Sequence, residues 1–280
     1  MRPKVIAVVG PTASGKSALG DFLAQKLRGE VISADSRQIY KGMKVISRAE
    51  AGHMVGIADP RRAMSAGAYA ALAAKKITMI YHSKKIPIVV GGTGFYAEAL
   101  LRGGLPEVVP NKKLRASLNK KTPVQLLARL RQLDPKSAAR VDPHNTVRLI
   151  RAIEVARALG SVPAPQPHGR YKVLWLGLRE SRNLRAGVEA RLRRGILAEA
   201  KKLRGALPRR RYMELGFEFD LLGDYIDKKI SKKELIGKIA NGERKYAKRQ
   251  LRWFKRNKDI LWVKTKAEAL ELSKQFLSGR

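Results

Sequence analysis

The chain of 280 residues contains no cysteine and only four histidines. The lack of cysteine excludes a disulfide-bonded scaffold and a zinc site built on thiolates, and so few histidines argue against a histidine-rich metal site. No apolar run approaches the roughly 20 residues that a membrane-spanning helix needs, and the N-terminus leads directly into a strand-like VIAVVG segment instead of a signal peptide. We therefore expect a cytoplasmic protein with no membrane association.

Acidic residues are also scarce, since 23 Asp and Glu stand against 59 Lys and Arg and give a formal charge of +36. Such an excess favours polyanion partners, because each cation placed against a phosphate releases condensed counterions. A lysine-rich composition that only solvates the surface is an equally good interpretation of the total charge. The distribution is uneven, however: residues 1–110 carry a net charge of +9 and residues 111–280 carry +27.

Apolar residues make up 44% of the chain, which is enough to bury the core of one large domain. Short β-branched runs alternate with segments of helical period, and this alternation predicts an α/β fold with a parallel sheet flanked by helices. The expected helices cover residues 16–28 and 68–82. The expected strands cover residues 4–9, 30–33 and 86–90, with weaker candidates at 173–178 and 260–263.

The chain changes character after residue 110. Residues 111–140 are polar, basic and helical in pattern, and they lie between Pro110 and Pro143, which predicts a small helical insertion. The amphipathic helix expected over residues 147–159 is assigned to the core. We therefore divide the chain into the first part of the core (1–110), the insertion (111–140), and the rest of the core with basic C-terminal helices (141–280).

The segment GPTASGKS fits the phosphate-binding pattern G-x-x-x-x-G-K-[ST] and lies between a predicted strand and a predicted helix. Backbone N–H groups and the positive end of the helix dipole can hold phosphate oxygens there, with the lysine bridging phosphates and the serine hydroxyl binding Mg²⁺. A kinase, an ATP-binding ATPase and a transferase that releases pyrophosphate would all use such a loop. Its residues are Gly10, Pro11, Thr12, Ala13, Ser14, Gly15, Lys16 and Ser17.

Two further polar loops follow predicted strands, at the edge where open parallel sheets assemble their sites. Asp35 follows the second strand and is a candidate general base, although a helix N-cap is an equally good interpretation. Thr93 lies in a GGTG turn and could offer its hydroxyl to an anionic leaving group. Taken alone, this motif is more simply an ordinary tight turn.

Five blocks together resemble a known family. GPTASGKS, ISADSRQIYKGM, IPIVVGGTGFY, RLIRAIEV and YAKRQLRWF occur in the order found in bacterial tRNA dimethylallyltransferases, also called tRNA isopentenyltransferases. The resemblance implies a P-loop NTPase-like fold and an Mg²⁺-dependent enzyme. It implies transfer of a dimethylallyl group from dimethylallyl diphosphate to N6 of the adenosine immediately 3′ of the anticodon, with the anticodon stem-loop of tRNA as partner. We expect a monomer.

The resemblance also implies roles for particular residues. Lys16 would neutralise the departing diphosphate together with Mg²⁺ bound at Ser17, Thr93 would hydrogen-bond the bridging oxygen, and Asp35 would accept the N6 proton. Gln38 would read the edge of the flipped adenine, whereas Arg115 could equally lie on a solvated helix face. The residues expected to contact tRNA are Asp35, Ser36, Arg37, Gln38, Thr93, Arg115, Val147, Arg148, Leu149, Ile150, Arg151, Arg244, Lys248 and Arg249.

The chain departs from the family at one charged position. Gly187 stands where typical members have an arginine that contacts the diphosphate, and we expect Arg185 or Arg191 to substitute for it. The resemblance leaves other functions open: an adenylate isopentenyltransferase acting on free nucleotide, a P-loop kinase or RNA-stimulated ATPase, or a degraded enzyme that only binds RNA. The charge and the insertion argue against a mononucleotide acceptor.

Overall fold

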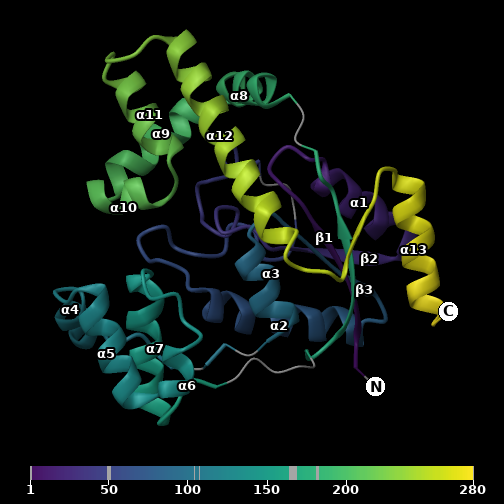
Figure 1. The fold of residues 1–280 in the computed structure, drawn as a ribbon. Coiled ribbons are helices and arrows are strands. Elements are labelled where there is room, and N and C mark those ends of the chain that lie inside the picture. Colours follow the sequence, from purple (N-terminus) through teal and green to yellow (C-terminus); the bar gives the residue numbers. More distant parts are fainter. Residues whose placement is uncertain are drawn as a thin grey trace. The chain divides into compact units, whose positions relative to one another are not determined.

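A computed structural model describes residues 2–48, 52–103, 105–106, 108–163, 169–180 and 183–279 (Figure 1). The chain divides into two compact units. The larger unit contains residues 1–102 together with 170–280, and the smaller contains residues 103–169.

The larger unit is built on a parallel sheet with the strand order β2-β3-β1-β4-β5. Its strands are β1 (Lys4–Val9), β2 (Gly29–Ser33), β3 (Ile86–Gly91), β4 (Lys172–Gly177) and β5 (Ile260–Trp262). The parallel α/β fold expected from the sequence is therefore confirmed. The central strand β1 pairs with β3 on one side and β4 on the other. The loop after β1 thus emerges where the strand order reverses, which is where open α/β sheets bind their ligands.

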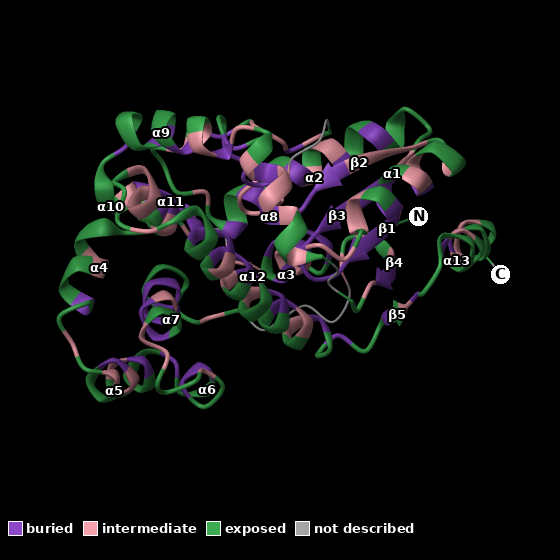
Figure 2. Cartoon of the chain, turned by 90° about the horizontal axis from the view of Figure 1, so that it is seen from above, coloured by how far each residue is buried: buried purple, intermediate pink, exposed green. Residues whose placement is uncertain are grey.

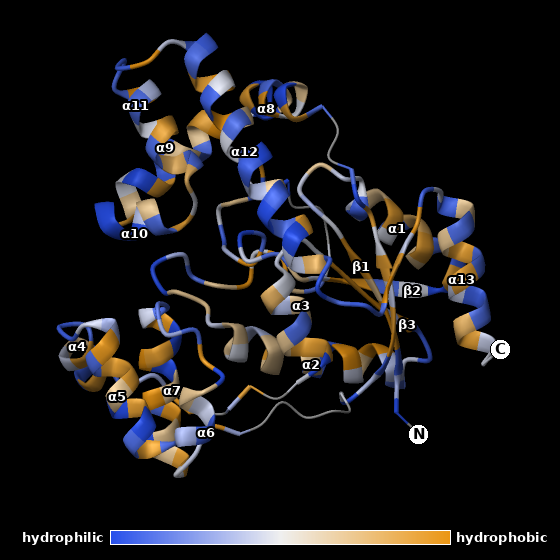
Figure 3. Ribbon diagram, in the orientation of Figure 1, coloured by the Kyte–Doolittle hydropathy of each residue, from blue (hydrophilic) through white to orange (hydrophobic). Residues whose placement is uncertain are grey.

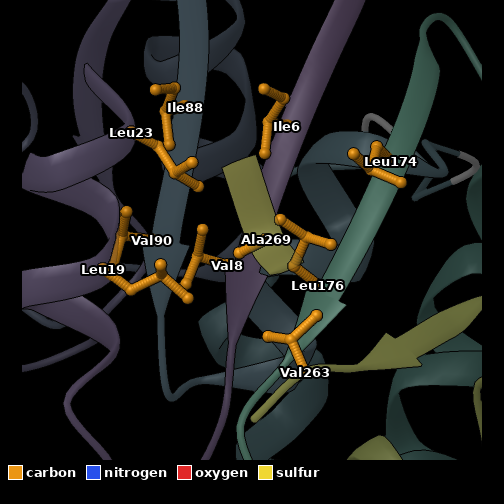
Figure 4. Close-up of a cluster of buried hydrophobic side chains, with 10 residues drawn as sticks. All are labelled: Ile6, Val8, Leu19, Leu23, Ile88, Val90, Leu174, Leu176, Val263 and Ala269. Atoms are coloured by element: carbon orange, nitrogen blue, oxygen red, sulfur yellow. The ribbon is translucent and has the colours of Figure 1, made fainter. Parts of the chain in front are cut away.

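The strands are apolar on both faces because helices cover both sides of the sheet. Helices α1 (Lys16–Leu27) and α13 (Lys266–Ser278) cover one face, and β1 is among the more hydrophobic segments of Figure 3. The cluster in Figure 4 joins these layers. It contains Ile6, Val8, Leu19, Leu23, Ile88, Val90, Leu174, Leu176, Val263 and Ala269, all buried.

Helices α2 (Ala66–His82) and α3 (Gly94–Leu101) pack together beside β2 and β3. The buried ring of Tyr69 from α2 stacks on that of Tyr96 from α3, with centroids 4.3 Å apart. The Tyr69 hydroxyl also donates to the carbonyl oxygen of Ser33 at 2.9 Å, at the carboxyl end of β2. This contact holds in place the loop that carries Asp35.

The C-terminal part of the larger unit is helical, as expected. It contains α8 (Leu184–Arg193), α9 (Ile196–Ala206), α10 (Arg209–Glu214), α11 (Glu218–Ile226) and α12 (Lys232–Phe254). One stripe of the long helix α12 is buried, whereas much of its surface is exposed (Figure 2). This amphipathic pattern lets α12 pack on the fold while it presents cations to solvent.

The smaller unit contains α4 (Lys112–Leu118), α5 (Pro123–Leu133), α6 (Pro135–Ala138) and α7 (Thr146–Leu159). Its apolar core combines Leu126 and Leu130 of α5 with Leu149 and Ile153 of α7. The insertion is therefore larger than the expected 111–140, and assigning the helix at 147–159 to the main core was wrong. Helices α4 to α6 cannot bury their apolar faces without α7.

None of the helices in the described ranges is long and apolar enough to cross a membrane.

Candidate active site at the carboxyl edge of the sheet

The loop between β1 and α1 has the shape that its sequence predicts. A side chain at Gly10 would bring a Cβ within 2.7 Å of the Leu178 carbonyl oxygen, and Gly15 has a left-handed φ of +87°. Ser14 Oγ is buried and has no hydrogen-bond partner within the described residues. A buried hydroxyl without a partner is costly, so this loop is suited to receive an anion.

Lys16 lies at the start of α1, where its Nζ donates to the Pro11 carbonyl oxygen at 3.1 Å. Burial lowers the pKa of Lys16 to about 8, with Asp35 opposing the shift and the charges of Arg48 and Arg37 adding to it. A phosphate would reverse this shift, because a bound anion favours the charged ammonium.

Asp35 lies directly after β2, as predicted. Its Oδ1 accepts a hydrogen bond from the backbone N–H of Arg37 at 2.9 Å. The residues that follow form turns, so the carboxylate caps a turn, and the helix N-cap interpretation is wrong. The hydrogen bond to Oδ1 orients the Asp35 side chain, and Oδ2 is the oxygen that could accept a proton from a substrate.

Thr93 is held against the same loop. Its Oγ1 accepts from the Ser36 N–H at 3.0 Å and lies 3.2 Å from Ser36 Oγ, while its backbone N–H donates to the Ala34 carbonyl oxygen at 3.2 Å. Although Thr93 precedes α3, its side chain does not cap that helix. The turn is therefore more than a tight connection, since it fixes a hydroxyl beside Asp35.

The phosphate-binding loop, the Asp35 loop and the end of β3 at Val90 and Gly91 border a common cavity of about 30 Å³. Lys16, Ser17, Asp21, Asp35 and Gln38 are among the residues that line it. Within the described ranges, no group of three or more His, Cys, Asp or Glu side chains could hold a metal by itself. Mg²⁺ is commonly held by one or two carboxylates, waters and substrate phosphates, so a hydroxyl and a carboxylate facing one cavity fit this ion.

Gln250 of α12 connects two of these loops, although the sequence did not single it out. Its Oε1 accepts from the Thr12 N–H at 2.8 Å, and its Nε2 donates to the Gly92 carbonyl oxygen at 2.8 Å. The side chain is buried. The signal in the sequence was a polar residue on a helix stripe that is mostly apolar.

Arg37 and Gln38 have partners within the protein. Arg37 forms an ion pair with the fully buried Glu218, and its guanidinium lies 5.6 Å from the Tyr246 ring. The amide of Gln38 accepts from Ser33 Oγ at 2.7 Å and donates to the Ser47 carbonyl oxygen at 3.2 Å. Both side chains therefore support the loop, and one donor and one acceptor of Gln38 are already used.

A second carboxylate, Glu243 of α12, is shared by two arginines. Arg48 Nη2 lies 3.0 Å from Glu243 Oε2, and the buried Arg191 binds the other oxygen. Arg191 Nη1 also donates to the Ile46 carbonyl oxygen at 3.2 Å, so this arginine has a structural role. Arg185 is exposed and pairs with Glu189 of its own helix. We expected Arg185 or Arg191 to replace the arginine that typical family members have at the position of Gly187. Arg191 is instead bound to Glu243 and the Ile46 carbonyl oxygen, and Arg185 is paired with Glu189.

In the smaller unit, Glu154 forms ion pairs with two of the arginines expected to contact tRNA. Arg115 Nη2 and Arg151 Nη1 bind its Oε2 at 2.7 and 2.6 Å. Burial raises the pKa of Glu154, but hydrogen bonds from both arginines outweigh burial and lower it to about 2. Arg115 thus lies on a partly exposed face with a fixed orientation.

The other residues of this unit that we expected to contact tRNA fall into an exposed group and a buried group. Val147 is 76% exposed and Arg148 is also exposed, so both are accessible. Leu149 and Ile150 are buried in the core of the unit. The side chains of these two residues are therefore closed to a ligand, and contact of the segment with tRNA stays a prediction.

Cations also extend along α12. Arg244, Lys248 and Arg249 are all exposed, and the Arg249 guanidinium lies 5.6 Å from the Tyr246 ring. Ala247 and Phe254 of the same helix are buried. This face suits phosphate contacts, whereas the opposite face secures the helix.

The family described as IPP transferase matches residues 38–257. The chain belongs to the IPP transferase family. The tRNA dimethylallyltransferase of Anaeromyxobacter dehalogenans is 34% identical over 99% of this chain and 98% of its own. The family resemblance stated from the five sequence blocks is therefore confirmed.

Solved structures agree. The tRNA isopentenylpyrophosphate transferase of Bacillus halodurans superposes with a TM-score of 0.70 at 30% identity, covering 99% of this chain and 96% of the other. A eukaryotic dimethylallyltransferase acting on tRNA gives a TM-score of 0.84 at 25% identity, covering 99% and 80%. As a member of the IPP transferase family, the chain is a prenyl-transferring enzyme whose P-loop NTPase-like fold was predicted correctly.

Proposed function

We propose that this enzyme transfers a dimethylallyl group from dimethylallyl diphosphate to N6 of the adenosine immediately 3′ of the anticodon in tRNA, releasing pyrophosphate. The observation that carries the proposal is the joint placement of Asp35 and Thr93 beside the phosphate-binding loop. The hydrogen bonds between Ser36 and Thr93 hold the two loops together at 3.0 and 3.2 Å. A kinase acting on phosphate alone has no need of this hydroxyl.

The residues divide the chemistry between them. The loop amides and Lys16 hold the diphosphate, and the Thr93 hydroxyl donates to the bridging oxygen as the allylic C–O bond breaks. N6 of adenine attacks the allylic carbon, forms the new C–N bond and loses a proton to Asp35 Oδ2. The electron pair of the broken bond leaves with pyrophosphate, whose negative charge the loop stabilises.

Mg²⁺ would be held by Ser17, which lines the same cavity as Lys16 and Asp35. When bound, the ion supplies positive charge that stabilises the leaving diphosphate.

Two surfaces support tRNA over a free nucleotide as acceptor. The exposed cations of α12 can contact phosphates of a long polyanion, and the smaller unit presents Arg115, Arg148 and Arg151. A mononucleotide carries too few phosphates to contact both sets. The target base must leave its stack to reach the cavity, which costs less in an anticodon loop than in a duplex.

The experiment compares acceptors. The protein is incubated with Mg²⁺, dimethylallyl diphosphate and either unmodified tRNA with adenosine after the anticodon, AMP, or ATP, and the products are analysed as nucleosides by mass spectrometry. We expect N6-prenylated adenosine from tRNA alone. Prenylated AMP or ATP would instead establish an adenylate isopentenyltransferase, and ATP hydrolysis without prenyl transfer would establish an ATPase. An Asp35→Asn variant serves as the inactive control.

A further inference from the structure

Arg48 occupies an unusual position next to the candidate active site. Its backbone φ is +55°, in the left-handed region that non-glycine residues rarely adopt. Its guanidinium is held by Glu243, with Nη2 at 3.2 Å from Oε1 and 3.0 Å from Oε2. Strained backbone of this kind persists only where the surrounding structure supports it, and it gathers at functional sites.

Gly187 of α8 makes room for this guanidinium. A Cβ at position 187 would lie 3.0 Å from Arg48 Nη2, closer than ordinary van der Waals contact. Gly187 lies inside a helix and is not among the described glycines with positive φ, so its backbone does not require glycine. Glycine is also less favourable than alanine in a helix interior. The space that it leaves for Arg48 is therefore the physical reason for glycine here.

The two arginines on Glu243 are not equivalent. The Arg191 side chain is 3% exposed and the Glu243 side chain 1%, so these two form a closed pair. The Arg48 side chain is 28% exposed, so it is more accessible to a ligand than Arg191 is. One carboxylate cannot neutralise both cations.

The segment that carries Arg48 is joined to the candidate active site. The carbonyl oxygen of Ser47, the residue before Arg48, accepts a hydrogen bond from Gln38 Nε2 at 3.2 Å, and Gln38 lines the same cavity as Lys16. Arg48 and Arg191 share the single carboxylate of Glu243, so their positive charges are only partly balanced by it. An anion nearby would reduce the repulsion between these cations.

We propose that Arg48, seated by Gly187 and Glu243, is a diphosphate-binding residue that contacts dimethylallyl diphosphate and the pyrophosphate it releases. The proposal rests on the proposed function for the identity of the donor. The bidentate contact with Glu243 fixes the direction of the guanidinium, which a lysine could not reproduce.

The first test replaces the guanidinium. Arg48→Gln is expected to raise KM for dimethylallyl diphosphate at least tenfold, to weaken inhibition by pyrophosphate to a similar degree, and to leave KM for tRNA unchanged. Arg185→Gln, on the exposed face of α8, is the matched control and should change none of these values. An unchanged KM for the diphosphate in Arg48→Gln, or a rise in KM for tRNA alone, would overturn the proposal.

The second test moves the guanidinium without removing it. Gly187→Ala should raise KM for the diphosphate three- to tenfold without lowering the melting temperature, because alanine favours the helix. In the Arg48→Gln background the same change should have no further effect. Equal effects of Gly187→Ala in both backgrounds would contradict the assigned contact.

A binding measurement separates this proposal from the proposed function. Calorimetry with inorganic pyrophosphate and Mg²⁺ requires no catalysis and no tRNA. Tighter binding by the unmodified protein than by Arg48→Gln supports the role of Arg48 even if prenyl transfer is not observed. Equal binding by both proteins overturns it even if prenyl transfer is confirmed.

Discussion

The loops at the carboxyl edge of the sheet and the ion pairs of the C-terminal helices lie in the same unit, yet they are built differently. The loops comprise residues 10–17, 33–38 and 91–94, and they are shaped by positive φ angles, backbone hydrogen bonds and hydrogen bonds from one loop to another. The ion pairs join residues far apart in sequence: Arg37 to Glu218 across 181 positions, and Arg48 to Glu243 across 195.

This difference separates two tasks. In the proposed mechanism the loops provide the groups that touch the reacting atoms, whereas the ion pairs set the charge around them and hold the loops in position. Gln250 belongs to both regions, because it lies on α12 with Glu243 and hydrogen-bonds two of the loops. If this division is correct, substitutions in the loops will mainly lower kcat. Substitutions in the ion pairs will mainly lower the free energy of unfolding.

The largest effect should come from the loop carboxylate. Asp35→Asn removes the proposed base but keeps an oxygen that can accept from the Arg37 N–H, so the turn should survive. We expect kcat to fall by about 10²–10⁴-fold, the usual contribution of general base catalysis. Steady-state kinetics, with tRNA affinity as the control, tests this. A kcat near that of the unmodified enzyme would show that Asp35 only shapes the turn.

A change in the ion pairs should act on stability. Glu243→Gln leaves the buried Arg191 without its carboxylate. We expect a loss of about 3–5 kcal/mol in the free energy of unfolding, the range for breaking a buried pair. Glu189→Gln breaks the exposed pair with Arg185 and should cost less than about 1 kcal/mol. Denaturant unfolding measures the free energy of unfolding of both variants. Equal losses would show that the buried pair stabilises the fold no more than the exposed pair does.

Gln250→Leu tests the connection between the two regions. The change leaves the Thr12 N–H and the Gly92 carbonyl oxygen without their buried partner. We expect the free energy of unfolding to fall by about 1–3 kcal/mol, the cost of unsatisfied buried groups. KM for the diphosphate should rise as well, since Thr12 belongs to its loop. Gln275→Leu, at an exposed position of α13, is the control, and similar behaviour of the two variants would contradict the linking role.

The smallest effect concerns pH. Lys16 has its pKa lowered to about 8, chiefly by burial, so its ammonium is charged below that pH and neutral above it. Binding a diphosphate favours the charged form, and binding therefore takes up a proton above pH 8. KM for dimethylallyl diphosphate should be flat below pH 8 and rise by up to about tenfold between pH 8 and 9. A Lys16→Arg variant keeps its charge and should lose this dependence; the same rise in that variant would assign it to another group.

Local features of the sequence were sufficient for much of the fold. The strands at 4–9, 86–90 and 173–178 were expected almost at their observed bounds, because a buried parallel strand is a continuous apolar run whatever its neighbours are. The helix at 147–159 was also expected, but not that it belongs to the smaller unit. Its apolar face has the same pattern whether it packs on a sheet or on α5, so periodicity cannot distinguish the two.

The candidate site shows the same limit. The loop of residues 10–17, Asp35 and Thr93 could be named because each follows a strand that predicts its position. The partners Gln250, Glu218 and Glu243 could not, since nothing within ten residues of them marks their contacts. The burial of the Leu149 and Ile150 side chains could not be predicted either, because the motif gave a segment and not the direction of its side chains.

The sequence by itself determined the phosphate-binding loop, the parallel sheet that presents it, and the family to which the enzyme belongs. These features depend on local backbone geometry and on the period of apolar residues, and both are determined by residues close together in the sequence. Only the tertiary structure decided which cations remain available to a ligand and which are neutralised. That outcome depends on distances between residues nearly 200 positions apart, such as Arg48 and Glu243. A charge acts through space, and its neighbours in space are not its neighbours in sequence.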